Sequence, residues 1–305
     1  MSFTLTILGA NSALPAYGRH HTAQLVTVES YHCMIDCGEA TQNQIQRYKI
    51  KANKINDIFI SHLHGDHYLG LMGLIYSMHL SGRTTDLHIF GQRGLDDIIL
   101  SQLRHSSSVL NFRLEFHELN PIFPEVIIEN DLITITSFPL KHRIPCCGFI
   151  IREKPKSRRI NKNTIPEGLS PDQFVALKKG EDILDDEGNV LYSNASCTLP
   201  PRNSRSYAYC SDTKYDEDLL AFIKNADLLY HEATFLNEKE EWALKTYHST
   251  TKQAATIAQK AGVKQLVIGH YSARYRYLDT FVNECREVFP NTIPAIEGET
   301  IEIKE

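Results

Sequence analysis

Short runs of apolar residues alternate with turn residues along the first half of the chain. The runs are rich in β-branched and aromatic side chains and are mostly bounded by Gly, Asn or Pro, which is the pattern of β-strands. We predict strands at Thr4–Leu8, Gln24–Val28, Cys33–Asp36, Asp57–Ser61, Leu87–Phe90, Leu114–Glu118 and Leu132–Ser137. Between these strands apolar residues recur at helical spacing. This spacing predicts helices over Glu39–Tyr48, Tyr68–His79 and Gly94–Leu103.

The last third of the chain repeats the alternation. Strands are predicted at Ser206–Cys210, Asp227–His231 and Gln265–Gly269. Helices are predicted near Glu217–Ile223, Thr251–Lys260 and Asp279–Val288. Helices that alternate with strands predict an α/β fold in which layers of helix pack on sheet.

A different kind of segment, residues 152–202, joins the two halves and has few large apolar residues and no sustained period. Its first part, Arg152–Lys162, carries six basic residues and one acidic residue, whereas residues 181–187 are acidic. A loop of this length inside a compact domain is usually functional or disordered. The plain alternative is a solvated surface insertion. We expect residues 1–305 to form one domain that carries residues 152–202 as an inserted basic arm.

The composition narrows the class of protein. The 305 residues are 42% hydrophobic and 23% charged, which excludes a disordered chain, a fibre and a small disulfide scaffold. Lys and Arg number 32 against 37 Asp and Glu, so a polyanionic partner would have to meet a local basic patch. The seven cysteines include no C-x-x-C pair, and the longest uncharged apolar stretch is about a dozen residues, too short to span a bilayer. We expect a cytoplasmic protein with no membrane segment.

Four potential metal ligands lie within six residues, directly after the predicted strand Asp57–Ser61. They are His62, His64, Asp66 and His67. A single histidine is more often a core residue than a ligand, but packing does not explain four such residues together. Imidazole and carboxylate are ligands that zinc prefers. The glycine between the second and third ligands lets the chain turn, so this one loop can contribute to two neighbouring metal sites.

Three further candidates share one placement. His142, Asp212 and His270 each come shortly after a predicted strand. The carboxyl ends of strands are where α/β proteins gather their sites. Each residue alone is a weak indication, and together they supply the ligands that two metal sites would still need.

The run His62–His67 resembles the H-x-H-x-D-H motif of the metallo-β-lactamase superfamily. Within it, the chain is most similar to the ribonuclease Z family of tRNA 3′-processing endonucleases. The first motif specifies only the superfamily, whereas later segments are more specific, and together they cover nearly the whole chain. These segments are Asp36–Gln42, His231–Phe235, His248–Thr251 and Ser272–Tyr275. The resemblance implies an αβ/βα four-layer sandwich with a protruding arm and with the site along one edge.

The resemblance also implies two Zn²⁺ ions per subunit. The ligands would be His62, His64 and His142 for the first zinc, Asp66, His67 and His270 for the second, and Asp212 as a bridge. One carboxylate can span two metals about 3.5–4 Å apart. A hydroxide shared by the two ions would attack the phosphodiester, and Asp66 would orient it or accept its proton.

The same resemblance assigns residues around the metals. His248 would be a proton donor or a phosphate contact, oriented by Glu232. The alternative for His248 is a neighbour of a helix cap formed by the next two residues. Contacts to backbone phosphates are expected from Ser12, Arg19 and Arg274. The adjacent thiols of Cys146 and Cys147 are possible alternative ligands, although neighbouring residues in a strand point to opposite faces.

The arm is implied to grip the tRNA elbow. Its basic residues are Lys154, Lys156, Arg158, Arg159, Lys178 and Lys179. The arm of relatives often carries a Gly-Pro turn, and this chain has Leu169–Gln173 in the arm instead. The function implied is a zinc-dependent endoribonuclease, a homodimer, that removes the 3′ trailer of precursor tRNA and leaves a 3′-hydroxyl.

Two alternatives remain open. The same fold could hydrolyse small phosphodiesters or other esters, a role that has no use for a basic gripping segment. The chain could instead be an RNA-binding subunit without metals. The presence of all seven ligand positions argues against that second alternative.

Overall fold

The structure, a computed structural model, describes residues 2–304. The chain divides into two compact units. One unit, which we call the body, comprises the described residues up to Ile151 together with Ser206–Lys304. The other, which we call the insert, is Arg152–Arg205. The sequence pattern had suggested an insertion over residues 152–202.

The first sheet of the body has seven strands in the order β18-β1-β2-β3-β4-β5-β6. Pairing is antiparallel from β18 to β3 and parallel from β3 to β6. The strands are β1 (Phe3–Gly9), β2 (Ala23–Val28), β3 (Tyr31–Cys37), β4 (Asp57–Phe59), β5 (Leu87–Gly91), β6 (Leu114–Glu118) and β18 (Thr300–Glu302).

The second sheet also has seven strands, in the order β17-β16-β15-β14-β9-β8-β7. Pairing is parallel from β14 to β17 and antiparallel between β7 and β8. The strands are β7 (Glu125–Glu129), β8 (Ile133–Pro139), β9 (Cys147–Glu153), β14 (Ser206–Cys210), β15 (Leu228–Glu232), β16 (Gln265–Gly269) and β17 (Thr292–Pro294).

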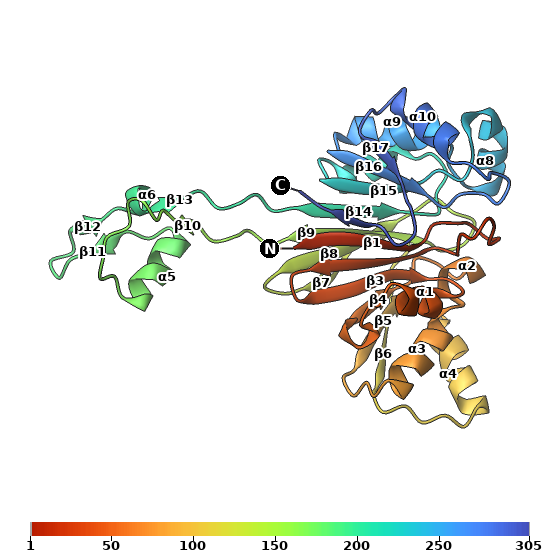
Figure 1. Cartoon of the computed structure of the whole chain (residues 1–305), viewed down its shortest axis with the longest axis horizontal. Helices are drawn as coiled ribbons and strands as arrows, with labels where there is room; N and C mark the ends of the chain where they lie inside the picture. The colour runs from red at the N-terminus through yellow and green to blue at the C-terminus, as the bar shows by residue number, and fades with distance from the viewer. Residues whose placement is uncertain (1, 305) are drawn as a thin grey trace. The chain divides into compact units, whose positions relative to one another are not determined.

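The side chains of β4, which face opposite sides of the sheet in turn, show how the layers are built. Phe59 faces the second sheet, and its ring lies 5.5 Å from the ring of Phe149 in β9. Its neighbour Ile58 points the other way, into a core formed with helix residues such as Leu74 and Ile99. Because successive strand residues face opposite sides, one strand supplies both cores. The body is thus a sandwich of two sheets with helices outside, which confirms the predicted αβ/βα fold (Figure 1).

The helices cover the outer faces of the two sheets (Figure 1). Those beside the first sheet are α1 (Thr41–Arg47), α2 (Gly65–Tyr68), α3 (Leu71–Leu80) and α4 (Leu95–His105), with a short 3₁₀ turn η1 (Ala52–Lys54). Those beside the second sheet are α7 (Leu220–Ile223), α8 (Glu240–Thr246), α9 (Thr251–Ala261) and α10 (Asp279–Arg286), with the 3₁₀ turns η2 (Glu217–Leu219) and η3 (Asn237–Lys239).

Two differences from the predicted elements have physical causes. The helix predicted over Tyr68–His79 is divided into α2 and α3, because the N–H of Gly70 donates to the carbonyl of Cys37 in β3 instead of to its own helix. The strands β7, β17 and β18 were not predicted. All three lie at sheet edges, where their residues are largely exposed or half-buried and the sequence therefore shows only a weak apolar pattern. The strand β9 and the helix α8 were also missed.

The insert is folded, although its sequence shows no sustained period. Its elements are only two to nine residues long: β10 (Arg159–Ile160), α5 (Pro171–Lys179), β11 (Ile183–Leu184), β12 (Val190–Tyr192), α6 (Asn194–Cys197) and β13 (Thr198–Leu199). They enclose a small core whose buried members are Leu177, Ile183 and Cys197. Such short elements cannot carry a periodic signal, which explains why the sequence did not reveal them.

Two features shape the insert. The segment that stands in place of a Gly-Pro turn begins α5, where Ser170 and Gln173 form a capping box around Pro171. At the base of the insert, Nη2 of Arg205 lies 2.7 Å from Oε1 of Glu153 and Nε lies 2.9 Å from Oε2. This buried, bidentate pair ties the two ends of the insert together.

Candidate metal centre

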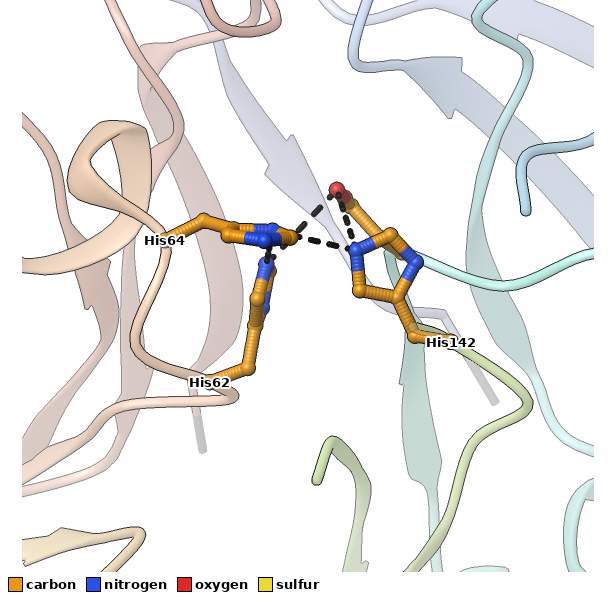
Figure 2. Close-up of side chains that lie close together, drawn as sticks. His62, His64 and His142 are labelled. Atoms are coloured by element: carbon orange, nitrogen blue, oxygen red, sulfur yellow. Dashed lines mark hydrogen bonds and ion pairs between the residues drawn. The ribbon is translucent and has the colours of Figure 1, made fainter. Parts of the chain in front are cut away.

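Three histidines converge beside one carboxylate at the ends of strands in the body. His64 Nδ1 lies 2.9 Å from His62 Nε2 and 3.1 Å from His142 Nε2. Figure 2 shows the three rings pointing toward one another. The Nε2 atoms of His62 and His142 each lie 3.8 Å from Oδ2 of Asp212. We call these four residues the first ligand group.

A second group lies beside the first. Oδ2 of Asp66 lies 3.5 Å from His67 Nε2 and 3.4 Å from His270 Nε2. The same two nitrogens lie 3.4 and 3.1 Å from Oδ1 of Asp212. Asp212 therefore presents Oδ2 to the first group and Oδ1 to the second, which is the placement that a bridging carboxylate needs.

Local chain geometry separates the ligands of the H-x-H-x-D-H run. His62 and His64 lie in the extended segment after β4, whereas Asp66 and His67 lie in the short helix α2, which begins at Gly65. The turn into α2 directs the second pair of ligands to the second group. The other ligands come from the loops after β8, β14 and β16, so all seven predicted ligand positions meet at one place.

Asp36, which the sequence reasoning did not single out, holds His67 in place. Its Oδ2 lies 2.7 Å from His67 Nδ1 and accepts the hydroxyl of Tyr209 at 2.6 Å. Its Oδ1 accepts the N–H of Ser61 at 2.7 Å. All of these groups are buried. Its only signal in the sequence was its place at the end of a strand and in the D-C-G-E segment of the family resemblance.

Three other ligand histidines, His62, His142 and His270, also have a partner on their second nitrogen. Ser61 Oγ lies 3.0 Å from Nδ1 of His62, and the carbonyl of Tyr247 lies 3.1 Å from Nδ1 of His142. Thr234 Oγ1 lies 2.9 Å from Nδ1 of His270. Such partners fix the ring orientation of metal-binding histidines. The sequence reasoning missed them as orienting groups, since they come from three separate parts of the chain.

The electrostatics of the two groups differ. Burial keeps the pKa of His62 well below its usual value and lowers that of His142 to about 4, so both rings are neutral, as metal ligands must be. At His67 burial also opposes the charged form, but Asp212, Asp36 and Asp66 outweigh it and raise the pKa. Three carboxylates around one imidazole create a strong demand for positive charge at the second group.

The residues fit a pair of divalent metal ions. His67 Nε2 is buried, and the described part of the chain gives it no hydrogen-bond partner, although its Nδ1 is paired with Asp36. In the neutral ring that binds a metal, a buried nitrogen left open in this way, beside two carboxylates, needs a cation or a donor. The donor set of imidazoles and carboxylates is the one expected for zinc or a similar ion.

His248 and Glu232 form a separate pair next to the ligands. His248 Nδ1 lies 2.9 Å from Oε1 of Glu232 and 3.9 Å from Oδ2 of Asp212. Burial disfavours the charged ring, but the carboxylates of Glu232 and Asp212 outweigh this and raise the pKa of His248 to about 9. Thr250 is the N-cap of α9 and forms a capping box with Gln253, so His248 does stand next to a helix cap, as the alternative had it, but its own ring is paired with Glu232.

A cleft of about 1020 Å³ opens beside both ligand groups. Ser12 and Arg274, two of the expected phosphate contacts, line it together with His248. Arg19 does not line it. The guanidinium of Arg19 donates to Asn11 Oδ1 at 2.8 Å and to the Tyr275 carbonyl at 2.6 Å, so it orders the loop that carries Ser12.

The adjacent cysteines lie outside the ligand groups. Among the described residues, the groups able to hold a metal contain only histidine and aspartate. Burial raises the pKa of Cys146 well above its usual value and that of Cys147 to about 11, which disfavours the thiolate that binds metals. The structure thus gives no support to these thiols as alternative ligands.

The basic residues of the insert fall into two classes. Arg159, Lys178 and Lys179 are exposed, and the N–H of Arg158 donates to the carbonyl of Lys178, so two basic runs lie side by side. Lys154 and Lys156 are half-buried. Lys156 Nζ lies 2.7 Å from Oε2 of Glu153, which commits it to an ion pair inside the insert.

None of the helices within residues 2–304 is both long enough and apolar enough to cross a membrane.

Two family descriptions match the chain. Residues 3–159 match the family described as Anti-Pycsar protein Apyc1, and residues 174–271 match the beta-lactamase superfamily domain. Among solved structures, the chain is similar to the short form of human tRNase Z, with a TM-score of 0.73 and 26% identity over 99% of this chain and 100% of that one. A metallo-beta-lactamase fold protein, YhfI from Bacillus subtilis, shares the fold at 19% identity. Its TM-score is 0.68, and the match covers 99% of this chain and 100% of that one.

Curated relatives are similar over nearly their full lengths. The chain is 46% identical to the ribonuclease Z of Cytophaga hutchinsonii over 305 residues, which is 100% of this chain and 97% of the relative. It is 43% identical to the ribonuclease Z of Bacteroides thetaiotaomicron, over 99% of this chain and 95% of the relative. These similarities confirm the resemblance found in the sequence motifs. The chain therefore belongs to the ribonuclease Z family of the metallo-β-lactamase superfamily.

Proposed function

We propose that this protein is an endoribonuclease that cleaves precursor tRNA after the acceptor stem and leaves a 3′-hydroxyl on the tRNA. The observation that carries the proposal is the sharing of Asp212 between two ligand groups, with the His248–Glu232 pair beside them. We further propose that the two groups hold two Zn²⁺ ions per subunit. Bound zinc would supply an activated water and neutralise charge on the phosphate.

The residues around the ions divide the remaining work. Asp66 lies between His67 and His270, where its carboxylate can orient the attacking water. Glu232 holds His248 with its Nδ1 paired, which leaves Nε2 for the substrate. Because Glu232 and Asp212 keep the ring protonated, His248 can donate a proton to the departing O3′ of the tRNA.

The insert supplies the grip in this proposal. Arg159, Lys178 and Lys179 are exposed cations, and phosphate contacts of this kind add affinity without reading sequence. In the complete chain acidic residues outnumber basic ones, 37 to 32, whereas the insert carries ten basic and eight acidic residues. The proposal also includes a homodimer in the cytoplasm, in which one subunit grips the tRNA that the other cleaves.

The decisive experiment separates grip from chemistry. Replacing residues 155–203 with a short Gly-Ser linker removes the insert but keeps the pair of Glu153 and Arg205 at its base. We expect this variant to bind metal and to hydrolyse a small chromogenic phosphodiester at an unchanged rate. Its cleavage of precursor tRNA should fall through weaker binding. Unchanged tRNA cleavage would contradict the gripping role, and loss of small-ester hydrolysis would favour the small-substrate alternative.

A charge variant makes the test finer. Changing Arg159, Lys178 and Lys179 to Glu keeps the insert intact but removes three exposed cations. The slope of log affinity against log salt should become shallower by about 2–3, since each phosphate contact contributes somewhat less than one. The matched control changes Asp185, Asp186 and Glu187 of the same insert to their amides, which should leave the slope unchanged or slightly steeper.

A further inference from the structure

An aromatic stack stands at the edge of the cleft. The guanidinium carbon of Arg274 lies 5.8 Å from the ring centroid of Phe235 and 5.8 Å from the ring centroid of Trp242. The three side chains therefore form one layered unit in which a cation contacts two rings. All three line the cleft that contains the ligand groups, and all three also line a smaller neighbouring pocket of about 620 Å³.

The two rings of the stack differ in exposure. Phe235 is 4% exposed and forms the buried side of the stack, whereas Trp242, on α8, is 47% exposed. Among the described residues no carboxylate forms an ion pair with Arg274, whose Nη1 reaches only the hydroxyl of Ser272 at 3.4 Å. A large aromatic face and a cation without a carboxylate partner are thus presented together to whatever enters the cleft.

The stack lies on one particular side of the metal centre. The ring of Phe235 meets the ring of His248 edge to face, with their centroids 6.2 Å apart. In the proposed reaction His248 protonates the departing O3′, and this oxygen belongs to the last nucleotide that the tRNA keeps. The nucleotide nearest the stack is therefore this one, not the first nucleotide of the trailer.

The side chains around Trp242 indicate which part of that nucleotide it meets. The rim of the smaller pocket carries Glu238, Glu240 and Glu241, and also Lys239 and Lys245. Because acids and cations nearly balance there, charge does not concentrate phosphates at the rim, and the exposed aromatic face of Trp242 decides the contact. Flat bases stack well on tryptophan and on guanidinium groups.

We propose that Trp242, with Arg274 and Phe235 behind it, stacks on the base of the last nucleotide retained by the tRNA and so positions the scissile bond. The inference rests on the proposed function and deepens it by naming a contact on the tRNA side of the cut. Trp242 touches the substrate but takes no part in proton transfer or metal binding.

The kinetics of Trp242 variants test the contact. In the holoenzyme, Trp242→Ala should raise KM for precursor tRNA by about 5- to 100-fold, the range that stacking of one base supplies, while Trp242→Phe should recover most of the loss. Leu244→Ala is the matched control, because Leu244 is exposed on the same helix and lines neither pocket.

Substrates that lack one base show which nucleotide is involved. Removing the base of the last retained nucleotide should weaken cleavage by the natural enzyme, and it should have little further effect on Trp242→Ala. Removing the base of the first trailer nucleotide should weaken both enzymes equally or not at all. The opposite pattern, in which the trailer base matters only to the natural enzyme, would overturn the assignment.

Fluorescence gives a readout that does not depend on cleavage. Trp242 is the only tryptophan of the chain, so its emission reports on this position alone. A tRNA that already ends at the last retained nucleotide should quench the emission of the holoenzyme, and the same tRNA with that terminal base removed should quench it much less. Equal quenching by both would overturn the stacking contact. Failure of the natural enzyme to cleave any precursor tRNA would instead overturn the proposed function, whatever the fluorescence shows.

Discussion

The carboxylate of Asp36 lies 2.7 Å from Nδ1 of His67, and both residues are fully buried. The same carboxylate accepts hydrogen bonds from Ser61 and from Tyr209, which reaches across from the second sheet. Asp36 thus connects the two sheets and fixes one nitrogen of His67, so that the other faces Asp66 and Asp212. Interactions of this kind orient metal ligands and raise their basicity.

This relationship predicts the effect of Asp36→Asn. The amide keeps the shape of the side chain but loses its charge, and we expect metal affinity to fall by about 10- to 100-fold, the range for a partner that orients a ligand. Competition with a chelator of known affinity measures the change. Asp57→Asn is the control, because Asp57 is also buried but pairs with Tyr31 outside the site. An unchanged affinity in Asp36→Asn would show that the contact does not support the ligand.

A second prediction concerns Asp212, which offers one oxygen to each ligand group. Asp212→Ala removes the only side chain shared by both groups, so at least one metal ion per chain should be lost and tRNA cleavage should nearly disappear. Elemental analysis of the purified variant measures the metal, and a precursor with a labelled trailer measures cleavage. Two metals per chain with normal cleavage would remove the bridging role.

A third prediction separates His248 from the ligands. Its Nδ1 is paired with Glu232, and the ring is proposed to donate a proton. His248→Ala should therefore keep the full metal content while the cleavage rate falls by about 10²- to 10⁴-fold, the range for a positioned acid or base. His142→Ala provides the contrast, since removal of a predicted ligand should lower the metal content. Metal loss in His248→Ala would place this residue among the ligands.

A fourth prediction concerns the stability of the insert in acid. Burial opposes the charge of Glu153, but Arg205 and Lys156 outweigh it and lower the pKa of Glu153 to about 2. A depressed carboxyl pKa stabilises the fold above the pKa of the unfolded chain, about 4.3, and this stabilisation is lost as the pH falls toward 2.

Glu153→Gln tests this. Compared with the natural protein, the variant should show faster amide hydrogen exchange in the insert at pH 6 to 7, and the difference should shrink as the pH falls below about 4. Glu167→Gln, an exposed position in the same insert, is the control. A difference that grows in acid would contradict the assignment of Glu153 as the stabilising anion.

Much of the fold could be predicted from the sequence because the responsible signals are local. The strands Leu114–Glu118, Ser206–Cys210 and Gln265–Gly269 have the predicted bounds, since the first alternates apolar and polar residues and the other two are aromatic or β-branched runs. Three of the four edge strands, β7, β17 and β18, and the elements of the insert were missed, because short or half-exposed segments lack a period. Their formation depends on neighbours that are distant in the sequence.

For the metal centre, the sequence by itself determined which residue types stand after which strands, and the four ligands of the H-x-H-x-D-H run. Only the tertiary structure decided which oxygen of Asp212 faces each group and that Asp36, Thr234 and Tyr247 hold the ligand rings. Asp36 and Tyr247 adopt left-handed backbone conformations, with φ of 57° and 61°, that their residue types do not predict. The physical reason is that these contacts join segments more than thirty residues apart, and the packing of two sheets brings them together.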